Sequence, residues 1–78
     1  MTIIEIRIRF KKGVADPEGM NVKKTLKALG FEVEGVKTEK VYEIEIDGSE
    51  QEAIAEGRLM CEKLLANPVI HNCEVTVR

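Results

Sequence analysis

The side chains that could take part in catalysis are few and lie far apart in the chain. The single histidine is His71, and the two cysteines are Cys61 and Cys73. A nucleophile needs a neighbouring base, and a metal needs converging ligands, which this spacing does not provide. We therefore expect His71 to be an ordinary loop side chain. The cysteines are expected to be buried free thiols in a reducing cytosol, and a disulfide or a metal site is the alternative.

Charged residues alternate with apolar ones in three segments, where they could form an acid–base pair or an anion site. The acidic members are Glu5, Glu43, Glu45 and Glu74. Arg7 and Arg9 could bind an anion, but the predicted strand neighbours favour cross-strand ion pairs with these carboxylates. No glycine-rich phosphate loop occurs. The sequence thus predicts no catalytic residue, no cofactor-binding residue and no metal ligand in this chain.

These residues must be positioned by short strands and two helices. The expected elements are a strand at 3–10, a helix from Pro17 to near Gly30, two strands between 31 and 46 with a turn near 38–40, a helix from Ser49 to near Ala66, and a strand at 73–78. Asp16 is the expected cap of the first helix, and Ser49 with Glu52 is a capping box for the second.

Two apolar stripes indicate which helix faces should be buried. The first contains Val22, Leu26 and Leu29, and the second contains Ile54, Gly57, Cys61, Leu64 and Leu65. Together with the element order β-α-β-β-α-β, they predict an α+β, ferredoxin-like sandwich over residues 1–78 as one domain. Its antiparallel sheet would have four strands in the order 4-1-3-2, with both helices on one face.

Composition narrows the possible functions of such a fold. The net charge of −2 argues against nucleic-acid binding, because phosphate recognition usually requires a basic face. Aromatic residues make up only 4%, too few for an RNA-recognition motif that stacks bases on its sheet. The loop after the first strand lacks the CxxC of metal chaperones and the arginine of acylphosphatases. No apolar run is long enough to span a membrane. A small core without metals favours self-association.

Three segments together resemble the PurS family. They are the run from Lys12 to Gly19, the stretch from Val36 to Ile46, and the run Leu64-Leu65-Ala66-Asn67-Pro68-Val69-Ile70, which is the most specific. The sequence departs from the family pattern in two places. Glu39 stands where a glycine is usual in the turn, and His71-Asn72-Cys73 replaces an acidic residue followed by an aromatic one.

The resemblance implies a non-catalytic small subunit of phosphoribosylformylglycinamidine (FGAM) synthase in de novo purine (IMP) biosynthesis. Such a subunit bridges a glutaminase and an ATP-dependent synthetase and supports ammonia transfer within a carbon–nitrogen ligase complex. It implies a cytoplasmic homo-oligomer, either dimer or tetramer, with ATP, magnesium and glutamine bound by the partner subunits. The candidate partner-contact loop contains Asn67, Pro68, Val69 and Ile70. The alternatives are a stand-alone ligand-binding regulatory dimer of the same topology and, less favoured, an independent enzyme.

Overall fold

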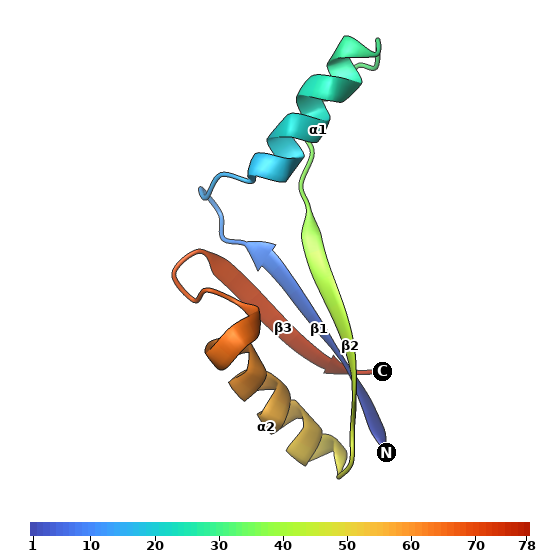
Figure 1. Cartoon of the computed structure of the whole chain (residues 1–78), viewed down its shortest axis with the longest axis vertical. Helices are drawn as coiled ribbons and strands as arrows, with labels where there is room; N and C mark the ends of the chain where they lie inside the picture. Colours follow the sequence, from blue (N-terminus) through green and yellow to red (C-terminus); the bar gives the residue numbers. More distant parts are fainter.

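A three-stranded antiparallel sheet and two helices make up the computed structural model, which describes residues 1–78. The elements are β1 (Thr2–Phe10), α1 (Pro17–Ala28), β2 (Glu39–Ile46), α2 (Glu50–Met60), the π-helical turn η1 (Cys61–Leu65) and β3 (His71–Val77). The strand order is β2-β1-β3. Helix α2 lies against one face of the sheet, whereas α1 projects beyond its end, so the molecule is elongated at 49 × 24 × 15 Å (Figure 1).

The core is the row of isoleucines on β1 beneath α2. Ile4, Ile6 and Ile8 are buried on one face of the central strand, as the alternating pattern predicts. Each fully buried isoleucine contributes roughly 1.5–3 kcal/mol relative to an exposed one. Helix α2 can approach closely because Gly57 has no side chain. A Cβ there would lie 2.7 Å from Cδ1 of Ile4 and 2.9 Å from Cγ1 of Val75.

Both predicted helix starts are confirmed. The Asp16 carboxylate accepts from the Gly19 N–H at 2.8 Å, and the Ser49 hydroxyl accepts from the Glu52 N–H at 3.2 Å. Helix α1 ends as expected at Gly30, whose φ of +98° suits a residue without Cβ. The N–H of Phe31 then bonds to the Leu26 carbonyl, which closes the helix end.

The predicted four-stranded order is not seen, because residues 31–38 form no strand. The turn expected near residues 38–40 is absent, and β2 begins instead at Glu39 as a direct continuation of the extended segment before it. A tight hairpin turn usually needs glycine or asparagine, and Glu39 supplies neither. Without that turn, residues 31–38 return alongside α1 (Figure 1), where the Val36 carbonyl packs against Gly19.

The prediction that both helices cover one sheet face is wrong for α1. Its expected buried stripe is largely open: Val22 is 39% and Leu29 is 69% exposed, and Phe31 just beyond the helix is 61% exposed. The physical reason is again the missing turn. The chain leaves β1 and returns to β2 along the direction of the strands, which carries α1 off the end of the sheet (Figure 1).

Residues 17–37, which comprise α1 and the segment that returns to β2, form an arm whose two ends are held together by one carboxylate. Besides capping α1, Asp16 accepts through Oδ2 from the backbone N–H of Thr38 at 2.6 Å and from its hydroxyl at 2.8 Å. The hydrogen bond from Gly19, followed by that from the Thr38 N–H, holds the pKa of Asp16 below its usual value. The ionised carboxylate thus connects the chain entering the arm with the chain leaving it.

We expect Asp16 to make stability depend on acid pH. Since its pKa is lowered by folding, its contribution is full above the ordinary value of 3.8 and is lost as the pH falls through the lower folded value. The Asp16→Asn variant should be less stable than wild type at neutral pH, and the gap should shrink below that value. Urea unfolding from neutral pH downward measures the gap, and a gap independent of pH would contradict the role of the charge.

Candidate functional site: a partner-contact surface

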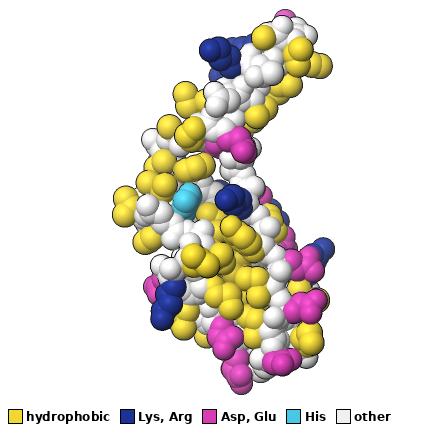
Figure 2. Space-filling model, viewed as in Figure 1, with side chains coloured by type: hydrophobic (Ala, Val, Ile, Leu, Met, Phe, Trp, Pro, Cys, Tyr) yellow, Lys and Arg dark blue, Asp and Glu magenta, His cyan; other side chains and the backbone are white.

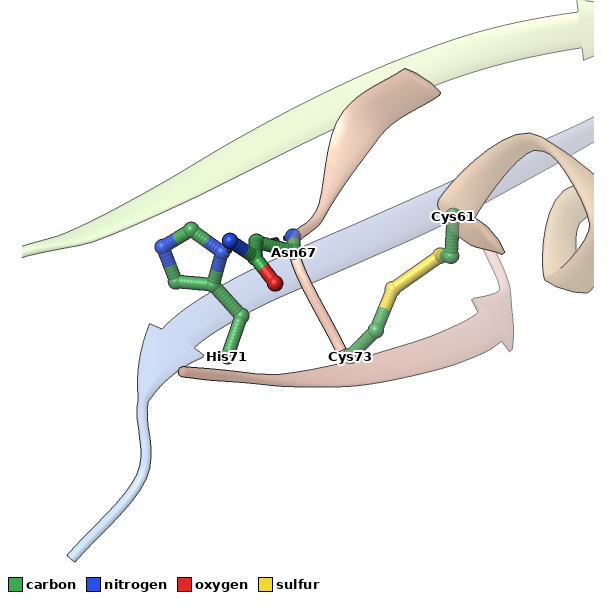
Figure 3. The surroundings of a disulfide bond; sticks show 4 residues. All are labelled: Cys61, Asn67, His71 and Cys73. Atoms are coloured by element: carbon green, nitrogen blue, oxygen red, sulfur yellow. Dashed lines mark hydrogen bonds between the residues drawn. A yellow bond between two sulfur atoms is a disulfide. The ribbon is translucent and has the colours of Figure 1, made fainter. Parts of the chain in front are cut away.

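The candidate partner-contact loop, residues 67–70, connects η1 to β3 and is organised by Asn67. Its side-chain Oδ1 accepts from the Val69 N–H at 3.0 Å, and its own N–H donates to Nδ1 of His71 at 2.9 Å. Its carbonyl accepts from the N–H groups of Ile70 and His71 at 3.0 and 2.8 Å. Figure 3 shows Asn67 and His71 facing each other across the loop. These bonds satisfy the turn without help from a partner.

The base of this loop is fixed to the sheet and its tip is open. The N–H of Lys11 donates to the Ile70 carbonyl at 2.8 Å, and the His71 ring lies 5.0 Å from the ring of Phe10. Val69 at the tip is 76% exposed, although it is a large apolar side chain. A held loop with an apolar tip can bind another protein at little cost in chain entropy.

An apolar hollow of about 470 Å³ lies beside the loop, between α2 and β2. Its lining is Ile44, Glu56, Leu59, Met60, Lys63, Leu64 and Leu65. Figure 2 shows hydrophobic side chains gathered across this face of the molecule. Helix α2 packs over β1 and β3, and the β2 side of the sheet is left uncovered. The hollow is therefore a surface on which an apolar element can dock.

The sequence reasoning missed this hollow because it placed Leu64 in the buried stripe. Leu64 is 83% exposed, whereas Leu65 packs against the core. The π-helical turn beginning at Cys61 inserts an extra residue and rotates the side chains that follow it. Adjacent residues on a helix lie about 100° apart and can share one broad apolar stripe, so the pair Leu64-Leu65 did not by itself indicate which leucine is exposed.

The expectation of free thiols is wrong, because Cys61 and Cys73 form a disulfide. Cys61 ends the stripe of α2 that packs on the sheet, and Cys73 lies opposite Ile8 on the same face of β3. Packing α2 on the sheet brings the two Cα atoms to 6.6 Å, within the range that a disulfide spans. Figure 3 shows this bond next to the candidate partner-contact loop.

The opposite sheet face carries the predicted ion pairs in a partly different arrangement. Arg9 pairs with Glu74 as expected, but Arg7 pairs with Glu5 and Glu39. Glu43 pairs instead with Arg78, and no bond of Glu45 is seen. The hydrogen bond to Glu5 and the charge of Glu39 raise the pKa of Arg7, so its guanidinium remains charged. Both arginines thus have carboxylate partners, which leaves less positive charge for an anion.

No group of three or more histidine, cysteine and acidic side chains is arranged to hold a metal ion. His71 lies at the start of β3, rather than in the loop where we expected it, and the Asn67 N–H occupies its Nδ1. None of the helices is long and apolar enough to span a membrane. The arrangement of exposed apolar side chains around a held loop is suited to binding protein.

Known proteins share this sequence and fold. The family model described as PurS, phosphoribosylformylglycinamidine (FGAM) synthase, matches residues 3–78. The PurS subunit of phosphoribosylformylglycinamidine synthase from Archaeoglobus fulgidus is 49% identical over 78 residues, covering 97% of this chain and 98% of that relative.

Two solved structures agree with that match. PurS of Methanocaldococcus jannaschii, a subunit of formylglycinamide ribonucleotide amidotransferase in the purine biosynthetic pathway, is 42% identical with a TM-score of 0.89, covering 100% of this chain and 96% of that one. A chain of the Thermotoga maritima PurLQS structure is 25% identical with a TM-score of 0.76, covering 99% and 96%. This chain therefore belongs to the PurS family of FGAM synthase subunits.

Proposed function

We propose that this chain is the non-catalytic small subunit that bridges the glutaminase and the ATP-dependent synthetase of FGAM synthase. The observation that carries the proposal is the likeness over 99% of this chain to a chain of the Thermotoga maritima PurLQS structure. The exposed apolar tip of the candidate partner-contact loop supports it, because such a tip suits a protein partner better than solvent.

The bridge acts by proximity. Ammonia released from glutamine in one subunit reaches the synthetase site directly when the two sites are held in register, rather than diffusing through solvent. In this proposal, glutamine binds the glutaminase, ATP and magnesium bind the synthetase, and this chain binds no cofactor. The complex works in the cytoplasm.

The function is tested by reconstitution with the two partner subunits. Alone, this chain should neither hydrolyse glutamine nor turn over ATP. Glutamine-dependent FGAM formation should require all three subunits, whereas synthesis from added ammonium should require only the synthetase, because ammonium bypasses the bridge. Product formation with each nitrogen source measures both rates. Full glutamine-dependent synthesis without this chain would contradict the proposal.

The candidate partner-contact loop gives a sharper prediction. Val69→Glu places a charge at a tip that is 76% exposed, so folding should be unchanged while the dissociation constant from the partners rises by more than about tenfold. Asn67→Ala should have the same direction of effect, because it removes the side-chain bond that orders the loop.

Val41→Glu is the matched control, since Val41 is also an exposed valine, at 49%, but lies on the outer sheet face beside Arg7. Calorimetric titration of the partners with each variant measures the affinities. Equal affinities of the Val69→Glu variant and wild type would show that the loop is only a helix terminator.

We propose further that two apolar surfaces of the chain cover each other between two copies. One is the apolar side of α1, with Val22, Leu26 and Leu29, and the other is the apolar hollow between α2 and β2. In the expected sandwich, a helix would cover the hollow, but the chain's own α1 lies beyond the sheet (Figure 1). Exchange of α1 between two copies would bury both surfaces.

Exchange of α1 between two copies would also complete the expected four-stranded sheet. The outer edge of β2 is unpaired within one chain, and residues 31–37 form no strand there. An unpaired edge is a template for pairing with another chain. In this arrangement, residues 31–37 of a second copy form the fourth strand beside β2, and a dimer is the smallest complete unit.

We expect sedimentation equilibrium at micromolar concentration to give a dimer or a tetramer. Leu29→Glu should raise the dissociation constant by more than about tenfold while leaving the fold intact, because Leu29 is 69% exposed within one chain. Lys24→Glu is the control, since it changes the charge of α1 on the other side of the helix. A monomeric wild type, or equal weakening by both substitutions, would contradict exchange of α1.

A further inference from the structure

The Cys61–Cys73 disulfide closes a covalent ring around the candidate partner-contact loop. Its sequence separation is 12, and the ring contains η1 and residues 67–70. One end is the first residue of η1, and the other is the third residue of β3 (Figure 3). Any change in this bond therefore acts first on the segment that carries the loop.

The two cysteine residues differ in exposure. Cys61 is 6% exposed and belongs to the core, whereas Cys73 is an exposed residue on an edge strand. Cys73 is thus the more accessible end of the bond for a thiol reagent. Exposed disulfides are the ones that exchange readily with thiols.

Most of the buried core lies outside the ring that this bond closes. The core around Ile4, Ile6 and Ile46 is built by β1, β2 and α2, which lie outside the ring except for Cys61 itself. Within the ring, Leu65 packs against the core and the Ile70 carbonyl is bonded to the sheet. The tip is less well held: Leu64 and Val69 are 83% and 76% exposed, and the turn relies on the hydrogen bonds of Asn67. Opening the ring would therefore loosen the loop and leave the sheet folded.

We propose that this disulfide is a redox device that sets the order of the candidate partner-contact loop and, through it, assembly with the partner subunits. The part of this proposal that concerns assembly with the partner subunits rests on the proposed function. In the reducing direction, a dithiol donates two electrons and two protons, the bond between the sulfurs breaks, both cysteines become thiols, and the dithiol becomes a disulfide. A disulfide oxidant such as oxidised glutathione reverses the step.

The test compares the oxidised chain, the chain reduced with dithiothreitol, and the Cys73→Ser variant. That variant cannot form the bond, and it changes only an exposed position. Intact mass establishes the state of each sample. Hydrogen exchange should be about tenfold or more faster in residues 62–72 of the reduced chain, with the core of β1 unchanged. The variant should match the reduced chain and should not respond to dithiothreitol.

Assembly is measured with the glutaminase and synthetase subunits by titration of both redox states. The reduced chain and the Cys73→Ser variant should bind about tenfold more weakly, because binding must then order the loop. Reoxidation with oxidised glutathione should restore the affinity of the wild-type chain only. Equal exchange in the two states would overturn the proposal, and so would equal affinity despite faster exchange.

Failure of both redox states to join the complex would have a different meaning. It would overturn the proposed function and the assembly half of this inference, while the exchange comparison would still decide whether the bond orders the loop. Faster hydrogen exchange in β1 on reduction would also overturn the redox proposal, because the disulfide would then stabilise the whole fold rather than the loop.

Discussion

The packing of α2 over the isoleucine row of β1 is the contact on which the rest of the molecule depends. Gly57 allows the helix to approach Ile4 and Ile6 to within van der Waals contact, and Ala53 is fully buried one turn earlier. Because β1 pairs with both other strands, this one contact also fixes the sheet. It also brings the end of α2 to β3, where the disulfide joins them. The core is small, and much apolar surface lies outside it.

That leftover apolar surface accounts for what the protein can do. The charged groups of the outer sheet face largely pair with each other, and exposed pairs of this kind contribute little to stability. Side chains that could react are scattered or already bonded, as His71 is to Asn67. The apolar hollow, the apolar side of α1 and the tip of the loop at Val69 remain open. Exposed apolar surfaces of this kind suit a family of enzyme subunits, because subunits contact other chains.

The molecule is elongated because the α1 arm extends beyond the end of the sheet. Asp16 and Thr38 hold the two ends of the α1 arm together, so the arm leaves the sheet as one unit. Inside this unit, Gly19 allows the Val36 carbonyl to pack against the helix. The apolar side of α1 has no sheet beneath it within one chain, whereas the turn at residues 67–70 satisfies its own hydrogen bonds.

Local features were determined by the sequence alone. Alternation fixed the face of β1, and the side chains of Asp16 and Ser49 fixed where the helices begin, because each acts within a few residues. The family was identified from three segments, of which the run at residues 64–70 is the most specific, and the family model confirms it. The role of the loop in that run stays a prediction. The tertiary structure alone decided where α1 goes, how many strands pair, whether Leu64 is buried and whether the cysteines meet. These depend on a turn that does not form, on a π-helical turn that rotates the stripe, and on packing between segments far apart in the chain. None of these leaves a local pattern strong enough to read.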